Sequence, residues 1–218
     1  MPQHRDKPKS NTRKVNGSRR EEYAETTKQA IIEAARYLFS EHGYFATKVD
    51  EIAVLARVAP ATVYAVAGGK QGLLRTMIET WTTAPVIATP LESIENLDDP
   101  AAILGLVAAG CRCVREEFGD IMRVMLSTAP HDREVSESLV MATARYREAF
   151  LPIGRRLLAI GGLRDGMDVA EAVDILWFYF GYSALFCLCD ENGWSYERAE
   201  IWLRQEATRA LLRVGTVL

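Results

Sequence analysis

Apolar residues recur three and four positions apart along most of this chain, which is the spacing that places side chains on one face of an α-helix. The first such segment starts near Ser18 and ends at Gly43, a residue type suited to the C-terminus of a helix. Its apolar positions are Ile31, Ala34, Ala35, Leu38 and Phe39. The pattern therefore predicts a first helix that buries one face.

Two short segments and a longer one follow within the next forty residues. The run Thr47-Lys48-Val49-Asp50 has the form of a capping box and predicts a short helix. The segment 57–59 leads to Pro60, which suits the first turn of a second short helix over residues 60–66. A fourth helix begins at Lys70 and ends before Pro85, with inward positions Leu73, Leu74, Met77, Ile78 and Trp81.

The rest of the chain has long helical patterns and few strand signals, so we predict an all-α protein. The expected helices cover residues 101–118, 120–127, 133–159, 169–189 and 196–217. We predict three parts: a disordered basic arm over 1–20, a helix-turn-helix domain over 21–80, and a larger helical domain over 81–218.

Charge is distributed unevenly between these parts. Residues 1–80 carry 13 Lys and Arg against 9 Asp and Glu, whereas residues 81–218 carry 13 against 20. A basic front and an acidic back indicate that only the front contacts a polyanion such as DNA. The arm either contributes to that contact or is an inert tail, and composition leaves both open.

Membrane insertion and secretion are not expected. The longest apolar stretch, residues 175–189, is shorter than the roughly 18 residues of a membrane span and is interpreted as a buried helix. Residues 1–20 contain no apolar run of the kind found in secretory signals. We therefore expect a cytoplasmic protein.

The four cysteines form two C-x-C pairs, Cys111 with Cys113 and Cys187 with Cys189. Residues two apart on a helix point in different directions, so one pair cannot hold one metal ion. We interpret all four as buried free thiols and expect neither a metal site nor a cofactor.

Residues 49–66 have the spacing of a helix-turn-helix, with small Ala53 where the helices cross and Val63 anchoring the second helix. In its wider context, AARYLFSEHGYFATKVDEIAVLARVAPATVYAVAGGKQGLL, this segment resembles the DNA-binding domain of the TetR (tetracycline repressor) family. The matching features are F-x-x-x-G-Y, then T-x-x-D-x-I-A, T-V-Y and K-x-x-L-L. The resemblance covers about a fifth of the chain.

The resemblance implies a homodimeric transcriptional repressor that binds double-stranded operator DNA and is released by a small apolar effector. Carried over by position, the DNA-binding residues are Thr47, Lys48, Arg57, Pro60, Ala61, Thr62, Tyr64 and Lys70. Read without the family, the two lysines are ordinary solvated side chains and Tyr64 is a packing residue.

Two positions depart from the family pattern. Arg57 stands where a glycine is common, so we expect it to adopt a left-handed conformation. Ala67 stands where a large aromatic residue is usual. Either Tyr44 or Phe45 fills the space, or the domain is packed more loosely than its relatives.

The expected effector lies between helices of the C-terminal domain. Its candidate contacts are Trp81, Cys111, Met122, Met125, Tyr146, Phe150 and Trp177, although each of them is also an ordinary core residue type. Arg112 and Arg115 are alternative anchors for an acidic ligand, or members of a solvated face. For the dimer interface the candidate stripes are Val173, Leu176, Trp177, Phe180, Gly181, Ala184 and Leu188, and Ala199, Trp202, Leu203, Ala210 and Leu211.

Two other functions stand as alternatives. One is a DNA-binding dimer with no effector, whose large domain serves only dimerisation. The other is an enzyme, for which the sequence offers neither H-E-x-x-H nor G-x-S-x-G, and Gly68-Gly69-Lys70 lacks the upstream glycine of a phosphate-binding loop.

Overall fold

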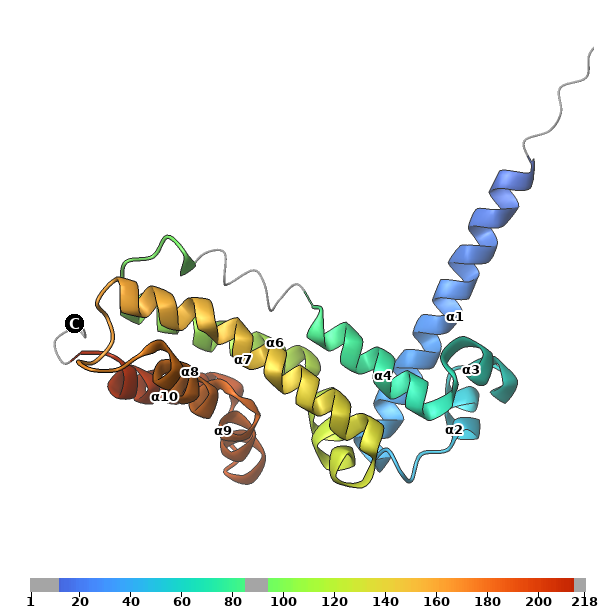
Figure 1. The fold of residues 1–218 in the computed structure, drawn as a ribbon. Helices are drawn as coiled ribbons and strands as arrows, with labels where there is room; N and C mark the ends of the chain where they lie inside the picture. The colour runs from blue at the N-terminus through green and yellow to red at the C-terminus, as the bar shows by residue number, and fades with distance from the viewer. Residues whose placement is uncertain (1–11, 85–93, 214–218) are drawn as a thin grey trace, which may run out of the picture. The chain divides into compact units, whose positions relative to one another are not determined.

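The computed structural model describes residues 12–84 and 94–213 (Figure 1). These residues are helical with connecting turns and an isolated antiparallel bridge between Leu163 and Leu212, so the predicted all-α fold is confirmed. The chain divides into two compact units, one ending at Leu73 and the other beginning at Leu74. The division falls inside a helix, whereas the sequence analysis placed it near residue 80.

The first unit contains α1 (Thr12–His42), α2 (Val49–Leu55), α3 (Pro60–Ala67) and the start of α4 (Gly69–Thr82). All five predicted apolar positions of α1 are buried, and the helix ends at His42, directly before Gly43, whose φ is +83°. α1 begins at Thr12, within the segment predicted to be a disordered arm. Extending an existing helix adds one hydrogen bond per residue, so polar residues are able to prolong it.

α2 and α3 form the predicted helix-turn-helix. Ile52, Ala53 and Val63 are buried between the helices, and the Val58 N–H donates to the Ala53 carbonyl at 2.9 Å to close the turn. Pro60 occupies the first turn of α3, and Gly68 ends it with φ +69°. The small size of Ala53 lets the two helices cross closely, as the sequence predicted.

The inward-facing side chains of α4 are divided between the two units, because the boundary falls between Leu73 and Leu74. The predicted positions Leu73, Leu74, Met77, Ile78 and Trp81 are all buried. The helix ends at Thr82, and Pro85, where its end was predicted, lies outside the described residues.

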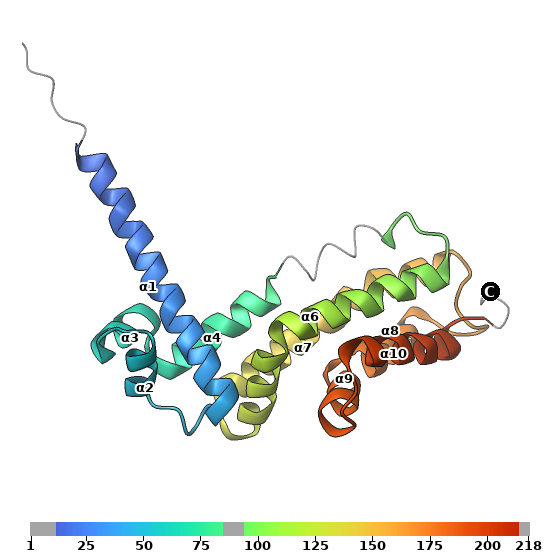
Figure 2. The same cartoon turned by 180° about the vertical axis from the view of Figure 1, so that it is seen from behind.

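The second unit contains α6 (Pro100–Thr128), a 3-10 turn (Ala129–His131), α7 (Arg133–Ala159), α8 (Val169–Phe180), α9 (Tyr182–Phe186), a π-helical turn (Cys187–Glu191) and α10 (Tyr196–Leu211). α6 packs against α7 and α10, α7 against α8, and α8 against α10 (Figures 1 and 2). The long helices start at side-chain caps, because Asp99, Asp132, Asp168 and Ser195 each accept from a backbone N–H in the first turn.

Two glycines in this unit act in opposite ways. We expected a helix boundary at Gly119, but α6 runs through it. A Cβ there would lie 3.0 Å from the Arg123 guanidinium, so the glycine makes room for a neighbour. We expected one helix over 169–189, but it breaks at Gly181. A Cβ there would collide with the Trp177 carbonyl of the same chain.

The segment Val169–Glu191 is apolar and long enough to resemble a membrane span by composition, with a mean hydropathy of 1.6. In the structure half of it is buried against the rest of the unit, and the break at Gly181 divides it into α8, α9 and the π-helical turn. This geometry fits the core helices of a packed domain.

Candidate functional site: a helix-turn-helix surface and an interior cavity

α3 presents a small, largely apolar face outward. Pro60, Ala61 and Tyr64 are exposed, Thr62 is half-buried, and Val63 points into the unit. From residue 59 to residue 67 no side chain is charged or carries an amide. Bidentate hydrogen bonds from Arg to guanine and from Asn or Gln to adenine are therefore unavailable from this helix. The face offers apolar contact with thymine methyl groups, and its hydroxyls are those of Thr62 and Tyr64.

Tyr64 both packs and remains accessible. Its side chain is 59% exposed, and one ring edge covers Gly69, where a Cβ would lie 3.0 Å from the Tyr64 Cε1 atom. The contact fixes the ring against the start of α4. A fixed, exposed phenol is suited to the phosphate contact that the family resemblance implies, and that contact stays a prediction.

Lys48 and Arg57 are exposed basic residues at the two ends of α2. Lys48, rather than Thr47, occupies the cap position, and its backbone N–H donates to the Glu51 carboxylate at 2.8 Å. The predicted capping box is therefore shifted by one residue. Both side chains project from the helix-turn-helix, as a role in phosphate contact requires.

Thr47 has a structural role instead of the predicted phosphate contact. It is 1% exposed, and its hydroxyl donates to the carbonyls of Gly43 and Leu38 at 2.9 and 3.1 Å. These carbonyls belong to the end of α1 and to the turn that follows it. The Thr47 hydroxyl thus stabilises the connection between α1 and α2, and its burial keeps it out of reach of a DNA phosphate.

Lys70 also differs from its predicted role. Its Nζ lies 2.8 Å from the carbonyl oxygens of Tyr44 and Thr47 and 3.4 Å from that of Phe45. Burial lowers the pKa of Lys70, with Glu51 acting in the opposite direction. Three carbonyl acceptors match the three N–H groups of the ammonium, so Lys70 ties α4 to the α1–α2 connection rather than offering a free charge to DNA.

The left-handed conformation predicted for Arg57 is confirmed, with φ +57°. We expect Arg57→Gly to raise the free energy of unfolding by about 0.5–1 kcal/mol, because glycine adopts this conformation without steric cost. The same change should weaken DNA binding, because a positive charge is lost. Arg57→Ala is the matched control: denaturation should show no gain in stability, and titrations should show the same loss of affinity. Undiminished affinity in both variants would contradict a DNA contact.

Tyr44 is the buried member of the aromatic pair expected to compensate for Ala67. Its ring packs edge-on against Phe39 at 5.2 Å and against Phe45 at 5.3 Å, and the Lys70 ammonium lies 4.7 Å from its centroid. Phe45 is largely exposed. The aromatic packing of this unit is therefore centred on Tyr44.

The second unit contains a partly open cavity of about 100 Å³ among the end of α4, Ile94, α6 and α7. Its wall is almost entirely apolar, and of the described residues that line it Arg145 alone is charged. The lining residues are Trp81, Thr82, Ile94, Leu106, Val107, Gly110, Cys111, Val114, Ala142, Arg145, Tyr146, Ala149, Phe150 and Ile153. Such a cavity suits a small molecule with an apolar body.

Four of the seven predicted ligand contacts line this cavity: Trp81, Cys111, Tyr146 and Phe150. The other three do not. Met122 and Met125 are fully buried core residues on α6. Trp177 packs edge-on against Tyr146 and Tyr182, at 5.6 and 5.2 Å, and is absent from the wall. The sequence analysis missed the small residues Gly110, Ala142 and Ala149, whose helical spacing on α6 and α7 leaves the space open.

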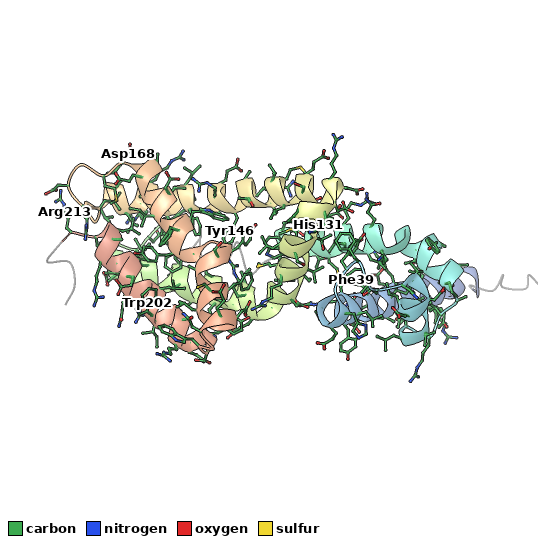
Figure 3. The ribbon with its side chains drawn as sticks, turned by 90° about the horizontal axis from the view of Figure 1, so that it is seen from below. Phe39, His131, Tyr146, Asp168, Trp202 and Arg213 are labelled. Carbon is green, nitrogen blue, oxygen red and sulfur yellow. The ribbon has the colours of Figure 1, made fainter. Side chains whose placement is uncertain are left out.

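Tyr146 is a buried polar group of the cavity wall, and Figure 3 shows it inside the second unit. Its hydroxyl donates to the Phe180 carbonyl at 3.0 Å, which the helix break at Gly181 has freed, and lies 3.4 Å from the Cys111 sulfur. Burial raises the pKa of the Tyr146 phenol well above its ordinary value. Burial also raises the pKa of the Cys111 thiol. Both groups are neutral at physiological pH.

The two stripes predicted for the dimer interface mostly face the unit's own core. Buried members include Val173, Leu176, Phe180 and Leu188 of the first stripe and Ala199, Leu203 and Leu211 of the second. The large apolar side chains that face outward on α8 and α10 are Phe178, Ile201 and Trp202, which are 69%, 48% and 40% exposed. Of these, only Trp202 belonged to a predicted stripe (Figure 3).

The cysteines are free thiols, as expected, but not all are buried, because Cys113 and Cys187 are exposed. Within residues 12–84 and 94–213, no group of three His, Cys, Asp or Glu side chains is arranged to hold a metal ion.

Fold and site together define an all-helical protein with a helix-turn-helix unit and a second unit that contains an apolar cavity. The sequence model described as bacterial regulatory proteins, tetR family, matches residues 31–77. The HTH-type transcriptional repressor SCO4008 of Streptomyces coelicolor is 30% identical over 126 residues, which cover 57% of this chain and 65% of that protein. The match thus spans slightly less than two thirds of the repressor.

Solved structures agree over most of the chain. The TetR-family regulator PfmR of Thermus thermophilus has a TM-score of 0.64 at 25% identity, covering 84% of this chain and 96% of PfmR. FadR of Bacillus subtilis, solved with stearoyl-CoA, has a TM-score of 0.67 at 18% identity, covering 83% and 97%. Residues 31–77 of this chain thus match the TetR family of bacterial regulatory proteins, and the described residues share the fold of the TetR-family regulator PfmR.

Proposed function

We propose that this chain is a DNA-binding transcriptional repressor that acts in the cytoplasm as a homodimer. It binds operator DNA through its helix-turn-helix and is released by a small molecule that binds in the second unit. The observation that carries the proposal is the helix-turn-helix itself, in which Ile52, Ala53 and Val63 hold α3 with its other face exposed.

The exposed residues of the helix-turn-helix fall into two sets, which are suited to phosphate contacts and to base contacts. Lys48, Arg57 and Tyr64 contact phosphates, which position the protein without regard to sequence. Pro60, Ala61 and Thr62 face base edges in the major groove. Thr47 and Lys70 contribute indirectly by fixing the connection that leads into α2.

Outward-facing aromatic residues on α8 and α10 support a dimer. Phe178 and Trp202 lie on two helices that pack against each other, and exposed aromatic side chains on neighbouring helices are typical of an interface. A two-fold dimer presents two copies of α3, one to each half of a symmetric site.

The cavity favours a ligand-sensing function over the alternative, a DNA-binding dimer without an effector. Its apolar wall of about 100 Å³ lies in the unit that does not contain the helix-turn-helix, and FadR, which shares this fold, was solved with stearoyl-CoA. Ligand and operator then influence each other reciprocally, because coupling between two binding sites acts equally in both directions. No observation on the described residues favours an enzyme.

DNase footprinting on the DNA upstream of the chain's own gene tests this function. We expect a protected region with two-fold symmetry. Ala61→Glu places a carboxylate on the exposed face of α3 and should abolish protection through repulsion from phosphates. Ala144→Glu, on an exposed position of α7, is the matched control and should protect like the wild type. Equal protection by the two variants would exclude α3 as the DNA-reading helix.

Base reading by α3 should depend on thymine methyl groups. Uracil lacks only this methyl, so replacing the thymines of one protected half-site with uracil should weaken binding, by up to about 1 kcal/mol for each contacted methyl group. A gel-shift titration comparing the two DNAs measures the effect. Identical affinities would show that α3 does not read the half-site in this way.

A further inference from the structure

A buried arginine lies beside the cavity of the second unit. Arg115 on α6 is 1% exposed. Its Nη2 donates to the Phe180 carbonyl at 3.2 Å, but its Nε and Nη1 have no acceptor. A buried charge whose hydrogen bonds are incomplete is costly. The interior of this unit therefore has room in its hydrogen bonding for an additional group that the chain's described residues do not supply.

The missing partner is a hydrogen-bond acceptor. Among the described residues, the buried side-chain nitrogen and oxygen atoms without a partner are Trp81 Nε1, Arg115 Nε and Arg115 Nη1. All three are donors. Trp81 lines the cavity, and its ring lies 5.9 Å from that of Tyr182, which in turn lies 5.6 Å from the Arg115 Cζ.

The surroundings of Arg115 provide little negative charge. The rings of Tyr146, Tyr182 and Phe186 lie 5.3, 5.6 and 5.6 Å from its Cζ. Cation–π contacts of this kind stabilise the charge only in part. Burial raises the pKa of Tyr146 and of Cys111, so neither becomes an anion near neutral pH.

One carboxylate approaches this region but is already engaged. Glu200 and Arg115 both line a second cavity, of about 10 Å³. The Glu200 carboxylate accepts from the Arg112 Nε at 2.6 Å, and Arg112 also pairs with Glu116. Glu200 therefore serves Arg112, and the Arg115 guanidinium keeps two N–H groups without an acceptor.

Cys111 connects the two cavities, because its side chain lines both. Arg115 follows it by one turn of α6. A ligand whose apolar body fills the larger cavity therefore contacts Cys111, the side chain shared with the smaller cavity that Arg115 lines. Arg145 is the charged residue of the larger cavity's wall, so the described lining carries positive charge and no acid.

We propose that the effector is an organic anion with an apolar body, such as a carboxylic acid, whose anionic end pairs with Arg115. The proposal rests on the proposed sensor function and narrows its ligand class. The anion accepts from the guanidinium N–H groups, and the apolar wall between α6 and α7 holds the body. A cationic compound of the same shape offers no acceptor, and a neutral alcohol offers only an uncharged one, which forms a weaker hydrogen bond with the guanidinium.

A purely structural role for Arg115 is the alternative. Arg115 and Tyr146 both donate to the Phe180 carbonyl at the helix break, and that contact alone would explain a buried arginine. The two roles differ in what removing the charge does. If Arg115 has only a structural role, replacing it lowers folding stability but leaves the preference for anionic over neutral ligands unchanged. If Arg115 binds the ligand, replacing it removes that preference.

Calorimetric titration with three probes of equal chain length separates the roles: octanoate, octan-1-ol and octylammonium. For the wild type we expect octanoate to bind at least about tenfold more tightly than octanol, the size expected for a charged hydrogen bond, and octylammonium most weakly. Arg115→Met should bring the octanoate-to-octanol ratio close to one. Arg112→Met, on the same helix but paired with Glu116 and Glu200, should retain the wild-type ratio.

Arg115→Lys keeps a positive charge and should retain part of the preference for octanoate over octanol. If Arg115→Met fails to fold, this variant distinguishes the two roles of Arg115. Equal binding of octanoate and octanol to the wild type, or no binding of either, overturns the proposal. So does an unchanged ratio in a folded Arg115→Met. DNA footprints of the same preparations report the proposed function separately, because protection in the absence of probe requires DNA binding but no occupied cavity.

Discussion

Phe178→Glu combined with Trp202→Glu should convert the protein to a monomer and lower its affinity for an operator by at least about a hundredfold. The two side chains are the largest outward-facing aromatic residues of α8 and α10. A carboxylate buried at an apolar interface without a partner costs several kcal/mol. A monomer binds only one half-site and loses the second set of contacts.

Light scattering and operator titration together measure this effect. Val140→Glu is the matched control, because Val140 is 67% exposed on α7, a helix that contributes no residue to the proposed interface. It should remain dimeric and bind DNA normally. A double variant that stays dimeric with full affinity would show that α8 and α10 do not form the interface.

Lys70→Met should destabilise the helix-turn-helix unit by about 1–2 kcal/mol. It removes the donor shared by the carbonyls of Tyr44, Phe45 and Thr47, and because these contacts are only partly buried, water replaces part of the lost hydrogen bonding. The loss should appear in chemical denaturation without DNA, which distinguishes Lys70 from a phosphate-binding lysine.

Lys48→Met is the control for this prediction, because the Lys48 side chain is exposed. It should leave the free energy of unfolding within about 0.5 kcal/mol of the wild type and weaken DNA binding instead. If Lys70→Met is as stable as the wild type and loses only DNA affinity, the phosphate contact that the family resemblance implies is correct.

The sequence was sufficient to predict the helices whose apolar positions all fall on one face. Ala53, Val63 and the inward positions of α4 occupy the buried places that their spacing predicts. The left-handed conformation of Arg57 was also predictable, but from the family resemblance, in which a glycine is common at this position. These properties depend on local geometry, which a single segment determines.

Thr47, Lys70 and the glycines show what local patterns do not determine. Whether a hydroxyl or ammonium faces solvent depends on carbonyls far away in sequence, such as Tyr44 for Lys70. Gly119 continues a helix and Gly181 ends one because different neighbours approach each of them. A glycine alone does not reveal which neighbour it faces.

The cavity was only half predictable for a similar reason. Helical spacing indicates which side chains point inward, but not whether the interior is filled. Met122 and Met125 fill their part of the core, whereas Ala142 and Ala149 on α7 leave space opposite Gly110 on α6. Only the packing of several helices together reveals such a space or a buried guanidinium such as that of Arg115.

Selection of bound fragments from a random double-stranded DNA library, followed by sequencing, tests the central claim most directly. A repressor dimer with two copies of α3 predicts an enriched site made of two inverted half-sites whose centres lie about 10–10.5 base pairs, one helical turn, apart. Thymines should recur at the positions facing Pro60, Ala61 and Thr62. The absence of any enriched sequence, or a single half-site without an inverted copy, would contradict the account.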